Sequence, residues 1–232
     1  MALTHVVGYR VVPGHEVEHQ GFLRQSVLGA GLPAGAVGRC VAHRLGHGGP
    51  EYVVITRWLS EAAFEAGTRS DGLPLYLEPK ADLLADCASA LYRDVVVSET
   101  ASAASRIVRL YRATIRRADR EHWENSAGRS VAALAQRPGI RTIHTGEGQA
   151  GENGTISVVA ITGWEDWASV IAATGGHLDR LLLDTELIDM EKAHSVEHYQ
   201  VLEPEPGPES RRAEVAPMSL ARAGDQQPDS SG

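Results

Sequence analysis

In the first half of the chain, short β-branched and aromatic runs alternate with longer segments whose apolar residues return at helical spacing. Residues 6–12 form such a run and stop at a Pro-Gly pair, which predicts a strand followed by a turn. Residues 15–30 have helical spacing, and Ser60 can cap a helix that begins at Glu61. We therefore predict the order strand, helix, strand, strand, helix, strand, with the remaining strands at residues 39–45, 52–58 and 90–97.

The second half of the chain repeats this order. Its strands are expected at residues 107–115, 140–145, 155–162 and 195–202, and its helices at residues 118–135 and 165–189. Each half thus has the order β-α-β-β-α-β, the ferredoxin-like arrangement in which two helices cover one face of a four-stranded antiparallel sheet. The other face of such a sheet stays exposed in a single copy. A second copy that covers it gives the duplication a physical reason.

The two halves also share short sequence motifs. Val6-Val7-Gly8-Tyr9-Arg10 returns roughly a hundred residues later as Val108-Arg109-Leu110-Tyr111-Arg112, and Ile55-Thr56-Arg57-Trp58 returns as Ile161-Thr162-Gly163-Trp164. A solenoid unit repeats about every 20 to 50 residues, whereas this repeat is about twice as long. Each copy is therefore expected to be a small domain of a fused pseudo-dimer. The predicted organisation is α+β, with repeat 1 at residues 4–98, a linker at 99–105, repeat 2 at 106–202 and a disordered tail at 203–232.

Composition narrows the classes of partner. The chain has 232 residues, and its formal charge of -8 provides no basic surface for nucleic acid. No apolar run reaches the ~18 residues of a membrane span, and the amino terminus lacks the pattern of a secretory signal. A cytoplasmic protein with no membrane partner is therefore expected. Its two cysteines, Cys40 and Cys87, cannot form a disulfide framework or a structural zinc site by themselves.

A family resemblance rests on the order of elements and on two local features. Pro138-Gly139 precedes a strand, and in both copies the third strand ends in a tryptophan, Trp58 or Trp164, shortly before a helix. These features resemble the antibiotic-biosynthesis monooxygenase domain of the dimeric α/β-barrel superfamily. The resemblance implies tandem ferredoxin-like repeats that form a fused dimeric α/β barrel, present as a monomeric pseudo-dimer or as a homodimer.

The same resemblance implies an activity. The chain is similar to tandem oxygenases that open or contract a ring of angucycline polyketides, as in jadomycin- and gilvocarcin-type pathways. It implies a monooxygenase of antibiotic biosynthesis that takes a reduced aromatic polyketide, of the quinol or anthrone type, and molecular oxygen. The haem-degrading branch of the family combines an Asn on the first strand with a Trp and a His on the second helix. Here the first strands carry Gly8-Tyr9-Arg10 and Leu110-Tyr111-Arg112, which counts against haem degradation.

The candidate catalytic residues are His43 and His144. Gly38-Arg39-Cys40-Val41-Ala42-His43 is echoed by Gly139-Ile140-Arg141-Thr142-Ile143-His144, which places the two histidines at matching positions of the second strand. A histidine titrates near neutral pH and is therefore a suitable general base for a phenolic or anthrone proton. One copy of a fused pair can lose its site, and the second copy has more aromatic residues, so His144 is the preferred base. The alternative is a hydrogen-bonded or solvent-facing strand histidine with no catalytic role.

A pocket for a flat polycyclic substrate needs apolar and aromatic walls with few polar groups. Tyrosine hydroxyls could hydrogen-bond an oxyanion, and Asn125 could orient a quinone oxygen. Packing between helix and sheet is the alternative for each aromatic residue. The candidate substrate-binding residues are Trp123, Trp167, Trp164, Trp58, Tyr9, Tyr111, Tyr76 and Asn125.

This chemistry requires no bound cofactor, because a deprotonated quinol or anthrone can itself reduce oxygen in a dry cavity. Reduced flavin stays open as a cosubstrate. Haem is one rival, since fused ferredoxin-like pairs resembling chlorite dismutase hold it, with His177 as the candidate proximal ligand. A non-catalytic small-molecule-binding protein is the other. No metal site is predicted, because His194 and His198 lack a completing carboxylate or Cys motif.

Overall fold

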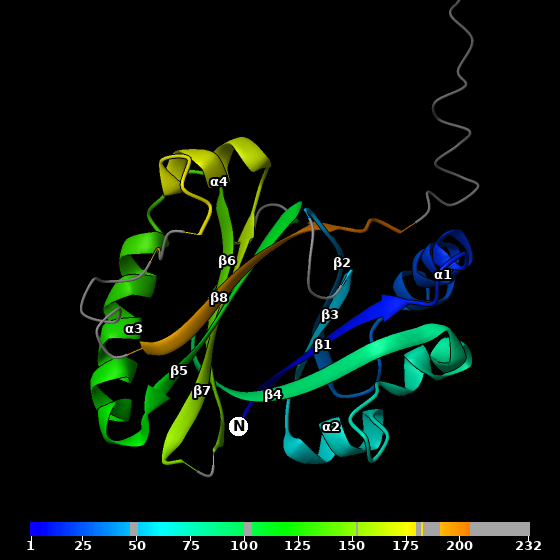
Figure 1. Ribbon diagram of the computed structural model, residues 1–232, viewed down its shortest axis with the longest axis horizontal. Coiled ribbons are helices and arrows are strands. Elements are labelled where there is room, and N and C mark those ends of the chain that lie inside the picture. The colour runs from blue at the N-terminus through cyan, green and yellow to red at the C-terminus, as the bar shows by residue number, and fades with distance from the viewer. Residues whose placement is uncertain (47–50, 100–103, 152, 180–181, 183–190, 205–232) are drawn as a thin grey trace, which may run out of the picture.

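The computed structural model describes residues 1–46, 51–99, 104–151, 153–179, 182 and 191–204, so most of the predicted linker and tail lie outside it. The strands form one closed antiparallel barrel with the order β1-β3-β2-β8-β5-β7-β6-β4 (Figure 1). Each half contributes four consecutive positions of that order, in the ferredoxin-like pattern. The fused α+β barrel predicted from the sequence is confirmed.

The first half contains strands β1 to β4 and two short helices. Its elements are β1 (Leu3–Val11), α1 (Glu16–Phe22), a π-helical turn (Leu23–Leu28), β2 (Ala36–Arg44), β3 (Tyr52–Trp58), α2 (Glu61–Gly67), a 3-10 segment (Leu75–Leu83) and β4 (Leu84–Glu99). The predicted first helix thus changes to π-helical geometry after Phe22. The predicted last strand begins six residues earlier than its apolar run, because Leu84 already pairs with Val11 of β1.

The second half repeats the arrangement. Its elements are β5 (Ile107–Arg116), a 3-10 turn (Arg117–Asp119), α3 (Arg120–Leu134), β6 (Ile140–Ala150), β7 (Thr155–Trp164), α4 (Trp167–Thr174) and β8 (Glu191–Val201). Helix α4 ends much earlier than the predicted 165–189 segment. Gly175 adopts a left-handed φ of 64° and ends the helix, as glycine commonly does at a C-cap. Most of residues 180–190 lie outside the described part of the chain.

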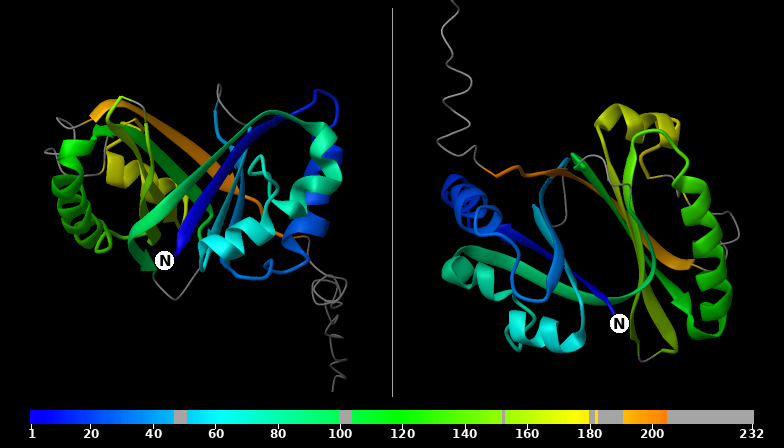
Figure 2. Two further views of the ribbon diagram at one scale, coloured as in Figure 1. Left: turned by 90° about the horizontal axis from the view of Figure 1, so that it is seen from below. Right: turned by 180° about the vertical axis from the view of Figure 1, so that it is seen from behind.

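The helices lie on the outside of the barrel wall, and the inner faces of the two halves meet in the barrel interior (Figure 2). Between the helices and the barrel wall, residues such as Val7 of β1 and Leu23 of the π-helical turn form the core of the first half. Ile115 of β5 and Trp123 of α3 belong to the corresponding core of the second half. A separate interior cluster combines residues of both halves, among them Val6, Ile55, Leu110, Ile161 and Tyr199. The second copy therefore buries the sheet face that one copy would expose. Among the described helices, none is long and apolar enough to cross a membrane.

Strand registers define which residues of the two halves correspond. Trp58 lies opposite Leu3, and Trp164 lies opposite Ile107, so these tryptophans occupy equivalent positions, as the motifs indicate. The second strands of both halves also have a bulge at the same place, opposite the residue that precedes each tryptophan. Beyond this bulge the two registers can be compared pair by pair.

This comparison corrects the expectation that His43 and His144 are equivalent. His144 lies opposite Ile161, whereas the residue opposite the equivalent Ile55 is Cys40. The counterpart of His144 is therefore Cys40, and His43 corresponds to Glu147. The motif match was three residues out of register. Because three is odd and strand residues alternate between faces, the two histidines point to opposite sides of the barrel wall.

Candidate functional site

A cavity of about 350 Å³ lies at the end of the barrel where β1 and β5 begin and β3 ends. Both halves line it, and its walls are mainly aliphatic. His144 borders the cavity from β6, and Cys40, its counterpart in the first half, borders it from β2. The principal apolar lining residues are Val37, Val41, Ile55, Val108, Ile161 and Val201. His144 thus lies where a bound molecule would contact both halves.

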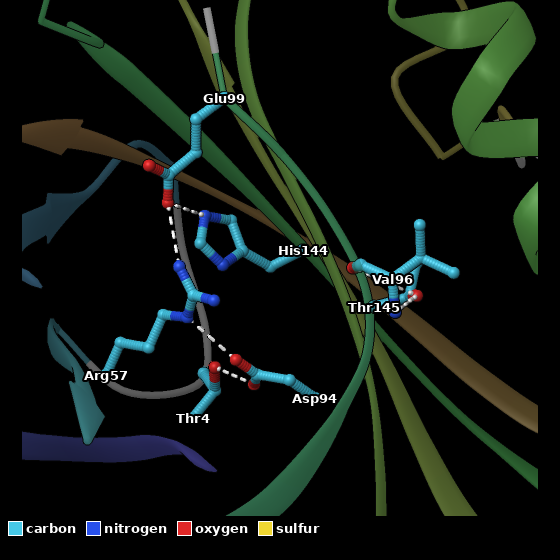
Figure 3. A network of polar contacts seen from close by, with 7 residues as sticks. All are labelled: Thr4, Arg57, Asp94, Val96, Glu99, His144 and Thr145. Carbon is cyan, nitrogen blue, oxygen red and sulfur yellow. Dashed lines mark hydrogen bonds and ion pairs between the residues drawn. The ribbon is translucent and has the colours of Figure 1, made fainter. Parts of the chain in front are cut away.

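A chain of polar contacts connects His144 to the first half (Figure 3). The Nε2 atom of His144 lies 3.4 Å from Oε1 of Glu99, an ion-pair distance. The same carboxylate oxygen accepts a hydrogen bond of 3.0 Å from Nη1 of Arg57. Arg57 also donates from Nε to Asp94 at 2.7 Å, and Thr4 donates its hydroxyl proton to Asp94 at 2.6 Å. One residue of the second half is thereby joined to four of the first.

The environment of His144 favours the neutral imidazole. Burial lowers the pKa of His144 below its ordinary value of 6.5, and the positive charge of Arg57 lowers it further. The carboxylates of Glu99 and Asp94 act in the opposite direction but do not cancel this effect. At neutral pH the ring therefore has a lone pair available to accept a proton. Once protonated, it would face the negative charge of Glu99.

Cys40 has the opposite character. Burial raises the pKa of its thiol to about 12, so the sulfur stays protonated at neutral pH. A thiol in that state is a weak nucleophile and behaves as a small apolar wall residue. The two equivalent positions on the second strands therefore differ in chemistry, and only the one in the second half can act as a base.

The side chain of His43 lies on the outer face of the barrel wall. It is exposed and its ring contacts Tyr52, with 5.0 Å between ring centroids. Tyr52 belongs to the helix-facing core of the first half, so His43 is on the opposite side of the wall from the cavity. The structure therefore brings one of the two predicted catalytic histidines to the cavity and leaves the other at the surface.

The four predicted tryptophans lie in the helix-facing layers. Trp58, Trp123 and Trp164 are fully buried between helices and sheets. The indole N–H of Trp164 donates to Thr162 at 2.8 Å, and Trp167 packs edge-on against His198 with 5.2 Å between ring centroids. None of the four lines the cavity that His144 borders. Packing, the alternative stated for these residues, accounts for their positions.

The remaining predicted substrate-binding residues are also outside this cavity. The Tyr9 hydroxyl lies 3.0 Å from Nε2 of His19, and the Tyr76 hydroxyl lies 2.6 Å from Oγ1 of Thr56. Tyr111 is buried in the helix-facing core of the second half. Asn125 is exposed on α3. The walls around His144 are aliphatic because the interior face of the sheets carries valines and isoleucines at this end.

Sequence reasoning missed Arg57, Glu99, Asp94 and Thr4. One signal was present, since Arg57 occupies a motif position where the second copy has Gly163. A break in an otherwise matched motif marks a position at which the two halves have diverged. The acidic partners had no comparable signal, because their meeting depends on the pairing of β1, β3, β4 and β6 around the barrel.

The haem and metal alternatives find no matching arrangement in the described part of the chain. His177 is exposed after α4 and does not border the cavity. His194 stacks on Tyr111, while His198 is buried against Trp167. Within the described residues, no group of three or more His, Cys, Asp or Glu could hold a metal ion. We therefore derive no step through haem or a metal.

No family model and no curated protein sequence matches the chain. Solved structures do resemble it. A candidate monooxygenase from Fusobacterium nucleatum subsp. nucleatum ATCC 25586 superposes with a TM-score of 0.66 at 12% identity, over 87% of this chain and 93% of that one. The chain shares the fold of such proteins. A candidate monooxygenase from Lactobacillus acidophilus NCFM gives a TM-score of 0.63 at 14% identity, over 86% and 93% of the two chains.

A third similar structure is an anthrone oxidase-like protein, with a TM-score of 0.61 at 12% identity over 87% of this chain and 91% of that one. The likeness to these three proteins covers the whole barrel of this chain rather than one half of it. At such low identity it establishes the fold, and it agrees with the arrangement that the family resemblance implied.

Proposed function

We propose that the chain is an oxygenase that acts on a reduced aromatic polyketide of the quinol or anthrone type in antibiotic biosynthesis. The observation that carries the proposal is the position of His144, a largely buried imidazole with a lowered pKa at the wall of an apolar cavity. The similar structures include candidate monooxygenases and an anthrone oxidase-like protein, which supports the same chemistry. The partners would be the small aromatic molecule and molecular oxygen.

The cavity suits a flat apolar molecule better than a charged one. Its volume of about 350 Å³ is near the lower end of the range of about 300–1,000 Å³ that ligand pockets occupy. Aliphatic walls exclude water from the bound molecule, which strengthens every electrostatic interaction inside the cavity. Polar groups are concentrated around His144, so the acidic C–H or O–H of the substrate would be oriented toward that side.

The reaction begins with transfer of the substrate proton to His144. The resulting anion is electron-rich and gives one electron to molecular oxygen, and recombination of the two radicals forms a C–O bond and a peroxide. For an anthrone, the peroxide loses water to give a quinone. The methylene carbon has then lost two hydrogens and gained one oxygen atom, while the second oxygen atom leaves in water. His144 returns its proton to the departing hydroxide and is regenerated.

Oxidative C–C cleavage or rearrangement of an angucycline ring is the finer form of the proposal. A peroxide formed at a ring carbon can lead to either outcome, and the family resemblance favours such a substrate. Comparing product masses from an anthrone and from an angucycline quinol would distinguish simple oxidation from ring opening. Turnover that appears only when reduced flavin is added would assign the electrons to flavin instead of the substrate.

The decisive experiment compares two histidine variants in an oxygen-uptake assay with a quinol or anthrone substrate. His144→Ala should lower the rate by roughly 10²- to 10⁴-fold, the usual contribution of a general base. His43→Ala is the matched control, because His43 is exposed on the outer face, and it should keep a near-normal rate. Circular dichroism confirms that both variants are folded.

Two outcomes would contradict the proposal. Equal, near-normal rates in both folded variants would exclude His144 as the base. Tight binding of the aromatic molecule by the unmodified chain, without any oxygen uptake in the presence or absence of reduced flavin, would identify a binding protein instead of an enzyme.

A further inference from the structure

The acidic and basic residues beside His144 all come from the first half of the chain, whereas His144 comes from the second. Arg57 is the penultimate residue of β3, Asp94 lies in the second half of β4, and Glu99 is the last residue of β4. Asp94 is only 8% exposed, Arg57 is 24% exposed and His144 is 17% exposed, so their charges are largely shielded from solvent. Glu99 is 53% exposed and therefore connects the buried group to water.

The contacts assign a different task to each residue. Asp94 accepts hydrogen bonds from both Thr4 and Arg57, which fixes the guanidinium in one orientation. Arg57 then holds Oε1 of Glu99 at 3.0 Å. That same oxygen lies 3.4 Å from Nε2 of His144. Without Arg57, an exposed glutamate at the end of a strand would have many rotamers and no fixed position near the ring.

We propose that Glu99 and Arg57 are positioning residues for His144. Glu99 stabilises the imidazolium that forms when His144 accepts the substrate proton, and Arg57, held by Asp94, keeps Glu99 in place. The assignment of His144 as the base rests on the proposed function. The charge network itself can be tested without any substrate.

The differences between the two halves also explain why the cavity has a histidine base from the second half and none from the first. The second-half counterpart of Arg57 is Gly163, and the first-half counterpart of His144 is Cys40. The first half thus has the arginine but no histidine at these positions, and the second half has the histidine but no arginine. The two side chains come together only where the halves meet. The other charged residue in the cavity wall, Arg39, donates to the Gly31 carbonyl and lies over the ring of Tyr76, so it is engaged on the outer face.

The test follows the titration of the His144 ring by NMR in the full-length protein. Glu99→Gln removes a negative charge beside the ring and should lower the pKa of His144 by about 0.3–0.7 unit, the size expected for a partly exposed ion pair. The matched control is Glu78→Gln, since Glu78 is also about half exposed and lies 4.0 Å from Arg69, away from the cavity. This control should leave the His144 titration unchanged.

A second variant keeps the test independent of folding defects. Arg57→Met alone would leave the buried Asp94 carboxylate without its cationic partner, so Asp94→Asn is combined with it. The double variant removes one positive and one negative charge and frees Glu99, so Glu99→Gln added to it should no longer shift the pKa of His144. A shift in the parent protein that disappears in this background supports the network. No shift on Glu99→Gln in the parent protein, or an equal shift in both backgrounds, would overturn it.

Kinetics then separate this proposal from the oxygenase proposal. With a quinol substrate, Glu99→Gln should lower the maximal rate two- to five-fold and move the acidic limb of the pH profile to lower pH. Movement of the limb in the direction opposite to the NMR shift would overturn the positioning role. A wild-type protein that titrates as expected yet consumes no oxygen would refute the oxygenase proposal and still support the charge network.

Discussion

Two equivalent tryptophans, Trp58 and Trp164, show how much a single residue type can reveal about this fold. Both recur in the sequence, both end a strand, and both are fully buried by the helices of their own half. Their position was predictable because a motif that ends a strand directly before a helix has few ways to bury a large ring. A role at a substrate was not predictable from the same motif, since burial in a core and burial in a pocket look alike in sequence.

The packing around Trp58 predicts a strong effect of one methyl group. A Cβ atom added at Gly67 would lie 2.1 Å from the Trp58 ring, which is far inside van der Waals contact. Gly67→Ala should therefore lower the free energy of unfolding by about 1–3 kcal/mol, as overpacking of a core does. Urea denaturation measures this difference.

The control for this substitution is Gly21→Ala in α1. A Cβ at Gly21 meets no atom within 4 Å, so alanine should be neutral or should stabilise the helix by about 0.5–1 kcal/mol through its better helix propensity. Equal stabilities of the two variants would mean that the Trp58 ring moves away at no cost, contrary to the packing argument.

At the scale of elements, order was easier to predict than register. The alternation of strands and helices followed from apolar spacing and turn residues, and every predicted strand exists. The predicted alignment of β2 with β6 was wrong by three residues. It rested on one glycine and one histidine shared by two short segments, and the connection to the next strand differs in length between the halves. Register depends on bulges and on long-range pairing, which leave little trace in a single sequence.

The start of α2 is an element boundary that the sequence did identify. The Ser60 side chain accepts a hydrogen bond from the Ala63 N–H at 3.2 Å, as expected of an N-cap. Ser60→Ala should lower the free energy of unfolding by about 1 kcal/mol, because an N–H of the first turn loses its acceptor. For a chain of this size the melting temperature should fall by about 2–4 °C.

The control is Ser60→Asp, which retains an acceptor and should melt close to the parent protein. Equal losses in both variants would mean that the serine hydroxyl stabilises the protein through a contact other than the N-cap hydrogen bond.

At the scale of the whole molecule, closure of the barrel decides which residues meet. The interior apolar cluster takes residues from both halves, and so do the cavity and the contacts around His144. A sequence can indicate that two copies pack together, as the repeated motifs did here. It does not indicate at which end of the barrel a cavity forms or which charges border it, because those depend on the size of interior side chains at every level of the barrel.

The whole molecule should also respond to acid through its buried histidines. Burial lowers the pKa of His5, His19 and His198 to about 4, and the pKa of His144 is lowered as well. In the unfolded chain these groups would titrate near the ordinary value of 6.5. Between pH 6.5 and pH 4 the unfolded state therefore binds more protons than the folded state. The stabilisation is fully present above pH 6.5 and is lost as the pH falls toward 4.

The size of this effect makes it measurable. Each unit of pKa difference corresponds to about 1.4 kcal/mol, so each of the three strongly shifted histidines can remove on the order of 3 kcal/mol by pH 4. Their sum is comparable to the whole stability of a typical domain, about 5–15 kcal/mol. We expect the free energy of unfolding, measured by urea denaturation at several pH values, to be flat above pH 7 and to fall steeply as the pH drops below 6.5. His19→Gln should reduce the slope by about one proton, whereas His43→Gln, at an exposed position, should leave it unchanged. A stability that stays constant between pH 7 and pH 5 would show that these rings accept protons in the folded state and that the barrel solvates them.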